Sequence, residues 1–280
     1  MEQLITIAAF AAYCRQARRP LGLVPTMGAL HAGHARLISR ARAECATAVA
    51  TIFVNPAQFA EPNDFAAYPR DLPADLATLE AAGVDAVFIP SAEEVYPCGH
   101  ATAVHVAGPA IPLEGDARPG HFDGVATIVA KLLIAAGADR AYFGQKDAQQ
   151  LAVVRRLRLD LGVPTAIVAV PTVREPDGLA LSSRNTLLSP EQRALASVLH
   201  SALQVGADCF VAGARDRELV EAASRAVLDR EQAHLSVDYV ALVSPDSMAP
   251  WKSGPALLAG AVRLGPVRLI DNLLLGDPQS

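Results

Sequence analysis

Two histidines stand three residues apart in the segment from Leu21 to His34, which reads LGLVPTMGALHAGH. An apolar run that predicts a strand comes first, and Gly33 immediately precedes the second histidine. A helix that begins here presents free backbone N–H groups and the positive end of its dipole, which favour a phosphate. Neutral imidazole can donate a hydrogen bond to a phosphate oxygen that gains charge during a reaction. The segment therefore predicts a phosphate-binding site at His31 and His34.

Two other interpretations of this histidine pair stay open. The imidazoles could only cap an exposed turn and keep it soluble, but their position directly after a strand ending in PTMG favours the phosphate site. A zinc site is the second alternative, although no cysteine or glutamate at ligand spacing accompanies the pair.

Polar side chains also follow two other predicted strands. In FVNPAQF, Asn55 and Gln58 are uncharged amides suited to orienting hydroxyls and carboxylates, although Asn-Pro alone also indicates a turn. In YFGQKDAQQL, Lys146 and Asp147 enter a predicted helix, and Gln150 follows one turn on. The positive charge of a lysine is unfavourable at the positive end of a helix dipole, and a bound phosphate would offset this repulsion. The alternative is a solvated charge pair that caps the helix.

Two loops add hydroxyls and positive charge. LALSSRN, residues 179–185, places two serines and Arg184 where they could clamp a polyphosphate and close over it. EGDARPGHFDGV, residues 114–125, contains Arg118 and His121 in a glycine-rich loop before a helix. This second loop is either a mobile cover or a long connection.

Short apolar runs alternate with helical patterns over the first two thirds of the chain. The runs predict strands at 21–24, 48–54, 86–89, 140–143 and 166–170. The helical patterns lie at about 34–46, 73–82, 123–136 and 147–161, with Gly83, Gly137 and Gly162 where helix C-caps belong. This alternation predicts an α/β fold with a parallel sheet covered on both faces. Ligands bind at the carboxyl ends of such strands, where the polar segments fall.

The pattern changes after residue 172. Pro190 and Glu191 open a long Ala/Leu helix, and another helix runs over 215–230. Strand-like stretches follow at 237–243, 256–262 and 267–272. We expect a catalytic domain at 1–175 and a smaller α+β lid domain at 176–280, with the boundary near 172–180.

Composition restricts the class of protein. The chain has 280 residues and a net charge of −5, which does not favour nucleic acid as a partner. Its four cysteines show no CxxC spacing, as is typical of reduced cytosolic thiols. No uncharged apolar stretch is long enough to span a membrane, and Glu2 precedes the apolar run at 5–13, unlike in a signal peptide. We expect a cytoplasmic protein without a membrane partner, opening with an amphipathic helix.

Six segments of the chain, in this order, resemble the pantothenate synthetase (pantoate–β-alanine ligase) family. They are PTMGALHxGHxxLI, FVNPxQF, YPRxxxxDL, EGxxRPxHFxGV, FGxKDxQQ and PTVRExDGLAxSSRN, and they span residues 20–190. The family belongs to the HxGH nucleotidyl-transferring group, similar to class I aminoacyl-tRNA synthetases. The resemblance implies a Rossmann-like nucleotide-binding domain and a homodimer. It also implies that ATP and pantoate give pantoyl adenylate and pyrophosphate with Mg²⁺, after which β-alanine displaces AMP.

The resemblance also implies roles for individual residues. The catalytic group would be His31, His34, Lys146 and Arg184. ATP would contact Pro25, Thr26, Met27, Gly28, Gly33, His34, Gly144, Lys146, Asp147, Val173, Leu181, Ser182, Ser183 and Arg184. Pantoate and β-alanine would contact Met27, Asn55, Gln58, Tyr68, Arg118 and Gln150, and Asp75 would help to hold the metal. Leu181 and Gln145 stand where the family often has methionine and glutamate; both flank the motifs and concern fine positioning.

Two rival functions remain at this point. A nucleotidyltransferase would move AMP onto a phosphate and stop, but the amides of Gln58 and Gln150 suit such an acceptor less well than arginine or lysine. A nucleotide-sensing module would bind ATP without turnover. A ligase needs no nucleophile beside a base, only oriented reactants, stabilised phosphate charge and a site that excludes water, for which the loops at 114–124 and 179–186 are candidates.

Overall fold

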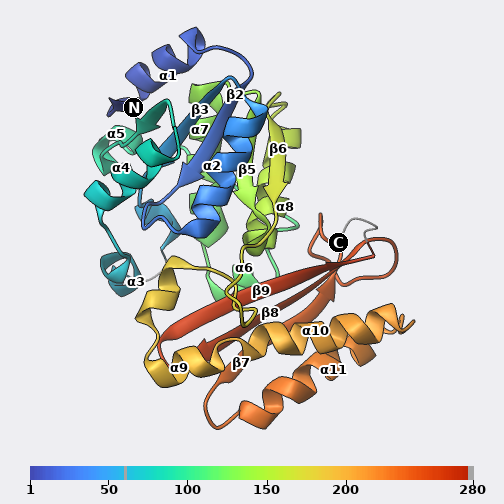
Figure 1. Cartoon of the computed structure of the whole chain (residues 1–280). Helices are drawn as coiled ribbons and strands as arrows, with labels where there is room; N and C mark the ends of the chain where they lie inside the picture. The colour runs from blue at the N-terminus through green and yellow to red at the C-terminus, as the bar shows by residue number, and fades with distance from the viewer. Residues whose placement is uncertain (60–61, 277–280) are drawn as a thin grey trace.

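The computed structural model describes residues 1–59 and 62–276, which form two β-sheets (Figure 1). The larger sheet is parallel, with the strand order β1-β4-β3-β2-β5-β6. Its strands are β1 (Glu2–Leu4), β2 (Leu21–Thr26), β3 (Thr47–Ile52), β4 (Ala86–Phe88), β5 (Arg140–Gly144) and β6 (Ala166–Val170). The chain winds outward from β2 to β4 and then returns to β5 beside β2. This reversal places the topological switch point, where open α/β sheets bind ligands, between β2 and β5.

Alternating side chains of each strand enter two separate cores. Leu21 and Leu23 of β2 pack on one face of the sheet, whereas Val24 packs on the other. The first face is covered by α1 (Ile7–Gln16), α7 (His121–Ala136) and α8 (Ala148–Asp160), and the second by α2 (Ala32–Glu44) and α4 (Leu72–Ala81). Burial on both faces explains the nearly continuous apolar strands and confirms the Rossmann-like α/β fold.

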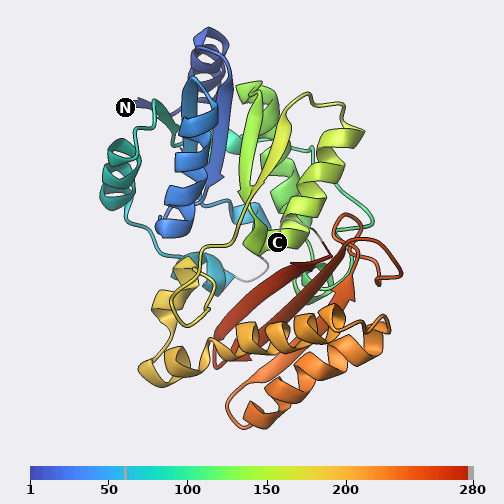
Figure 2. The same ribbon diagram turned by 45° about the vertical axis from the view of Figure 1, so that its right-hand side comes forward.

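The smaller sheet is antiparallel, in the order β7-β8-β9, and lies below the parallel sheet in Figure 1 and Figure 2. Its strands are β7 (Ser236–Val243), β8 (Ala256–Leu264) and β9 (Val267–Leu275). Leu258 points toward α10 (Val198–Val211) and α11 (Arg217–Leu228) on one face. On the other face, Leu257 packs with Ala148 and Ala152 of α8. The small sheet therefore rests directly on the helix that follows β5.

The long helix expected from Pro190 is divided into α9 (Pro190–Leu195) and α10. The Ala196 N–H donates to the Arg193 carbonyl, three residues back, which tightens the last turn of α9. Residues 190–211 contain an 18-residue stretch with a mean hydropathy of 1.4, long and apolar enough to cross a membrane, of which 39% is buried. Because Leu203 and Phe210 of α10 pack into the core beside the small sheet, these residues form a core helix.

The remaining differences from the sequence predictions are short elements that were not predicted. Strand β1 was not expected, and it adds an edge strand beside β4 through only three residue pairs. The short segments α3 (Pro62–Ala67), α5 (Ala92–Val95) and α6 (Glu114–Ala117) also lacked a clear periodic pattern because each has too few residues to show one. Gly137 adopts a left-handed conformation at the C-cap of α7, as predicted.

Candidate active site

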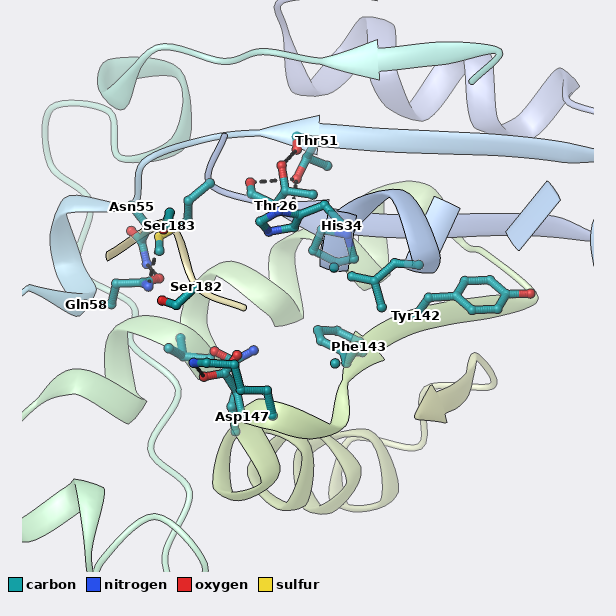
Figure 3. A pocket seen from close by; sticks show the side chains of 18 of the residues that line it. Thr26, His34, Thr51, Asn55, Gln58, Tyr142, Phe143, Asp147, Ser182 and Ser183 are labelled. Carbon is teal, nitrogen blue, oxygen red and sulfur yellow. Dashed lines mark hydrogen bonds and ion pairs between the residues drawn. The ribbon is translucent and has the colours of Figure 1, made fainter. Parts of the chain in front are cut away.

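A cavity of about 240 Å³ lies at the carboxyl ends of β2, β3, β5 and β6 (Figure 3). It brings together every residue that the sequence analysis assigned to the catalytic group, to ATP or to the two carbon substrates, except Gly28. These lining residues are Pro25, Thr26, Met27, His31, Gly33, His34, Asn55, Gln58, Tyr68, Arg118, Gly144, Lys146, Asp147, Gln150, Val173, Leu181, Ser182, Ser183 and Arg184. Segments far apart in sequence thus meet in one concave site at the switch point.

The two histidines form the N-terminal cap of α2. His31 is the N-cap residue, and its Nδ1 accepts a hydrogen bond of 3.1 Å from the Gly33 N–H. In return, His34 Nδ1 accepts from the His31 N–H at 3.3 Å. A Cβ on Gly33 would lie 2.7 Å from His31 Cε1, so the His31 ring can pack this closely against residue 33 only because that residue is glycine. Because both Nδ1 atoms accept, the network assigns the proton of each neutral imidazole to Nε2.

Both imidazoles favour the neutral form. Burial, followed by the neighbouring His31, lowers the pKa of His34 to about 3. Burial, followed by the charge of Lys146, lowers the pKa of His31. The two histidines can therefore cap the helix and bind a ligand at the same time. Their Nδ1 atoms hold the turn, and their Nε2–H groups remain available to donate hydrogen bonds to a ligand.

Lys146 and Asp147 lie on η2 (Gln145–Asp147), a short 3₁₀ turn between β5 and α8. The side chain of Lys146 is 18% exposed, and its Nζ lies 3.5 Å from Asp147 Oδ1. Asp147 occupies the N-cap position of α8 without a side-chain capping hydrogen bond. In Figure 3 its carboxylate lies on the opposite side of the cavity from Thr26 and His34. Asp147 therefore does not cap α8 with its side chain, contrary to the alternative of a charge pair that caps the helix. Lys146 and Asp147 both line the cavity instead.

Gly28 and Asp75 lie just behind the cavity wall. The Asp75 carboxylate is 4% exposed and accepts hydrogen bonds from the N–H groups of Ala29 at 2.9 Å and Leu30 at 2.7 Å. Gly28 has φ +80°, and a Cβ there would lie 2.7 Å from Asp75 Oδ2. The structure therefore shows Asp75 anchoring the PTMGAL loop through both carboxylate oxygens, and the metal role implied by the resemblance stays a prediction.

Replacing Asp75 with alanine is expected to lower the free energy of unfolding by about 2–4 kcal/mol, because two partly buried N–H groups lose their acceptor. Urea denaturation measures the change. Glu80→Ala on the same helix is the matched control, since the Glu80 side chain is 74% exposed. Equal, small effects of both variants would contradict the anchoring role of Asp75.

Positive charge gathers on the side of the cavity near Tyr68. Arg184 Nη2 lies 3.2 Å from Asp64 Oδ2, and Arg118 Nη2 lies 4.0 Å from the same oxygen. The Arg184 guanidinium lies 5.7 Å from the centre of the Tyr68 ring. Burial, and after it the Arg184 charge, lowers the pKa of Arg118. Together with Lys146, these groups make the cavity locally cationic in a chain of net charge −5, which favours anionic ligands.

Residues 2–274 match the sequence profile described as Pantoate-beta-alanine ligase. The chain belongs to this ligase family. It is 53% identical over 276 residues to a pantothenate synthetase of Chloroflexus aggregans, with 98% of this chain and 99% of the relative covered. It is 51% identical over 278 residues to the pantothenate synthetase of Roseiflexus castenholzii, again with 98% of this chain and 99% of the relative covered.

Solved structures of this ligase family have the same fold. Pantothenate synthetase from Thermus thermophilus superposes with a TM-score of 0.90 at 47% identity, covering 98% of this chain and 99% of the other. Pantoate-beta-alanine ligase from Francisella tularensis, complexed with beta-gamma ATP and beta-alanine, gives a TM-score of 0.80 at 33% identity, covering 98% and 97%. The predictions of an enzyme and of a Rossmann-like ligase fold are therefore confirmed.

Asn55 lines the cavity of this ligase and also holds neighbouring groups in place through its hydrogen bonds. It is 1% exposed, and its Nδ2 donates to Gln58 Oε1 at 3.1 Å and to the Gly124 carbonyl at 3.0 Å. Its Oδ1 accepts from the Tyr96 hydroxyl at 2.6 Å. Gln58 Nε2 in turn lies 3.0 Å from Met27 Sδ. Since thioether sulfur is a weak acceptor, Gln58 keeps a donor that a substrate can take over, whereas Asn55 holds Gln58 in place.

His121 is a cavity residue that the sequence analysis left in a covering loop. Its Nδ1 lies 2.8 Å from the Gln58 carbonyl and its Nε2 lies 3.2 Å from Arg118 Nη1. Because arginine only donates, Nε2 must accept and Nδ1 must bear the proton. Burial, followed by the Arg118 charge, lowers the pKa of His121 to about 4. His121 thus bridges Gln58 and Arg118, a role that needs contacts over 63 residues and leaves no local pattern.

Acidification is expected to destabilise the ligase through His121. Its pKa falls from 6.5 in the unfolded chain to about 4 in the folded one. The unfolded state therefore binds a proton that the native state resists, and stability is lost as the pH falls below 6.5. At pH 5 the contribution of His121 to this loss is about 2 kcal/mol. Urea denaturation at pH 7 and pH 5 measures it; His121→Asn should reduce the difference, and His234→Asn, at an exposed position, should retain it.

Proposed function

We propose that the enzyme joins pantoate to β-alanine at this cavity in two steps, with ATP as the activating substrate. The observation that carries the proposal is the convergence of Lys146, Arg118 and Arg184 with two imidazole Nε2–H donors around buried amide side chains. The names of the relatives and the ligands of the Francisella tularensis structure support the choice of substrates.

In the first step, a carboxylate oxygen of pantoate attacks the α-phosphorus of ATP, and the bond to the bridging oxygen breaks to release pyrophosphate. Two anions must approach each other, and negative charge grows on the phosphate oxygens. His31, His34 and Lys146 offer N–H donors and positive charge for these oxygens. The N-terminus of α2 adds its dipole. The product is pantoyl adenylate.

In the second step, the amine nitrogen of β-alanine attacks the acyl carbon, the acyl–oxygen bond breaks, AMP leaves and the nitrogen releases a proton. No protein nucleophile is required, so the site contributes mainly orientation, which is worth on the order of 7–11 kcal/mol. Gln58 and Gln150 would hold the pantoate hydroxyls and carboxylate without adding a fixed charge. Arg118 and Arg184 would bind the remaining anionic groups.

The adenylate must be shielded from water between the steps, and the loops at 114–124 and 179–186 are placed to do this. Glu114 Oε1 accepts a hydrogen bond of 2.8 Å from the Tyr239 hydroxyl on β7, which ties the first loop to the small sheet. The second loop contributes Ser182, Ser183 and Arg184 to the cavity. The small sheet and the second loop belong to the lid unit at 176–280, and the first loop extends from the catalytic unit at 1–175 to meet that sheet.

Mg²⁺ enters this proposal as part of the substrate, bound to the ATP phosphates. Among residues 1–59 and 62–276, no group of three or more His, Cys, Asp or Glu side chains is arranged to hold a metal ion. Mg²⁺ commonly keeps several waters and uses substrate phosphates as ligands. The donor set therefore fits a metal carried by the nucleotide, not a resident site.

The cellular setting follows from the same proposal. Cys14, Cys45, Cys98 and Cys209 are all free thiols, which suits a reducing cytoplasm. The homodimer implied by the family resemblance is part of the proposal and is tested by light scattering of the purified enzyme.

The test is to incubate the enzyme with ATP, Mg²⁺ and pantoate, with and without β-alanine, and to measure AMP, ADP and pyrophosphate. The proposal expects AMP and pyrophosphate to accumulate catalytically only when both carbon substrates are present. ADP would instead indicate an acyl phosphate and overturn the roles of His31 and His34. Bound ATP without turnover would favour a nucleotide sensor.

A further inference from the structure

The turn that presents Lys146 is held by a residue of the small sheet. Asn272 of β9 donates from Nδ2 to the Gln145 carbonyl at 3.0 Å and to the Lys146 carbonyl at 2.8 Å. Asn272 is 5% exposed and stands 126 residues beyond Lys146 in the sequence. Both N–H groups of one amide thus hold the consecutive carbonyls of η2. They fix the peptide plane between them, and so the direction in which Lys146 leaves the backbone.

The turn needs such support because of its length. A 3₁₀ helix of three residues contains little hydrogen bonding of its own, and the hydrogen bonds of 3₁₀ geometry are poorly aligned. Lys146 is also a long, flexible side chain, so a small rotation of its backbone moves Nζ considerably. A fixed backbone at this point favours a fixed position of the ammonium group in the cavity.

Asn272 is itself held firmly. Its N–H donates to Asp271 Oδ1 at 2.8 Å. Asp271 is 4% exposed and accepts from Arg174 through both carboxylate oxygens, at 2.6 Å and 2.9 Å. Arg174 precedes the serine-containing loop. The pair Asp271–Asn272 therefore ties one strand of the small sheet both to the chain between the sheets and to the Lys146 turn.

The amide orientation of Asn272 follows from its surroundings. Two carbonyl oxygens demand donors, so the NH₂ group must face η2. The Oδ1 atom is buried and has no hydrogen-bond partner within the part of the chain that the structure describes. Because an unpaired buried acceptor is unfavourable, the contribution of this side chain lies in its two donor contacts.

We propose that Asn272 is a positioning residue for adenylate formation, which sets the place of Lys146 in the cavity from the small sheet. The inference rests on the proposed function, since it assumes that Lys146 stabilises charge on the ATP phosphates. The inference adds that the lid unit influences adenylate formation through the hydrogen bonds from Asn272 to the Gln145 and Lys146 carbonyls.

The test replaces Asn272 with aspartate, which keeps the shape but turns the two donors into acceptors facing two carbonyls. Single-turnover rates are measured with enzyme in excess for pyrophosphate release from ATP and pantoate. They are measured separately for the reaction of supplied pantoyl adenylate with β-alanine. We expect N272D to slow the first step about 10- to 100-fold, as a displacement of about 1 Å would, and to leave the second step within about twofold.

A double-mutant cycle with Lys146→Ala separates positioning from a general structural effect. If Asn272 acts through Lys146, N272D causes no further loss in the K146A background. Asn272→Ala, which removes the donors without adding charge, replaces N272D if that variant does not fold. Arg263→Ala is the matched control, because it breaks an exposed ion pair of 3.1 Å to Asp238 in the same sheet and should leave both steps unchanged.

The outcomes distinguish this inference from the proposed function. A normal first step in N272D, while K146A is impaired, would overturn the inference alone. Equal slowing of both steps, or an equal further loss in the K146A background, would show that Asn272 acts on the fold and would overturn it as well. A K146A variant with wild-type rates would overturn the proposed role of Lys146, and the positioning role with it.

Discussion

Lys146→Ala is expected to lower the rate of adenylate formation by about 100- to 1,000-fold while the enzyme still folds. The ammonium group faces the cavity from a short turn and lies 3.5 Å from Asp147 Oδ1, on a side chain that is 18% exposed. In such a partly desolvated site, a positive charge interacts with phosphate oxygens more strongly than it would in water. The measurement is pyrophosphate release from ATP and pantoate under single-turnover conditions.

Two further variants show whether the charge itself is responsible. Lys146→Arg keeps the positive charge on a larger, planar group and should recover only part of the rate. Lys252→Ala removes an exposed lysine of the small-sheet region and should behave like the wild type. Wild-type turnover by K146A, with an unchanged melting temperature, would remove Lys146 from the mechanism.

The parallel sheet was predictable from sequence because each of its central strands buries both faces. Leu21 and Leu23 enter one core and Val24 the other, so the strand appears as an uninterrupted apolar run between polar segments. The edge strand β1 has three residues and one neighbour, which is too little to create a pattern. Helix α10 was recognisable from its apolar face, but its separation from α9 depends on a single tightened turn.

The cavity residues were predictable where their types alone suggest chemistry. The spacing HAGH contains its own capping network, since His31 and His34 exchange hydrogen bonds with backbone groups within three residues. In contrast, Asp75 meets the loop that it anchors across 45 residues, and His121 reaches Gln58 across 63. Supporting residues of this kind are defined by tertiary contacts, and a single sequence contains no local trace of them.

The same distinction explains how the two parts of the chain cooperate. Residues that would face the nucleotide come from the ends of parallel strands, whereas the groups that fix their positions come from elsewhere in the fold. Asn272 holds the Lys146 turn from β9, and His121 at the start of α7 contacts the Gln58 carbonyl from 63 residues away. Sequence reasoning therefore identifies the chemistry of the site, and the structure identifies the contacts that hold the reacting groups in place.

Replacing His34 with alanine is expected to slow the first step by about 100- to 1,000-fold and to leave the second step nearly unchanged. His34 Nδ1 accepts from the backbone of His31, which directs Nε2–H away from the helix as a donor. Burial and the neighbouring His31 lower the pKa of His34 to about 3, so this donor is a neutral imidazole throughout the neutral pH range. The first-step rate should therefore show no inflection from His34 between pH 6 and pH 8.

The assay compares pyrophosphate release with the reaction of supplied pantoyl adenylate and β-alanine. His34→Gln, which can place an N–H near the position of Nε2, should recover part of the first-step rate, whereas His34→Ala should not. His105→Ala, at an imidazole that is 69% exposed, is the control and should retain wild-type rates. Loss of the cap costs about 1 kcal/mol of stability in His34→Ala, too little to unfold the enzyme at 25 °C. Equal slowing of the two steps would show that His34 supports the site as a whole instead of the phosphate chemistry.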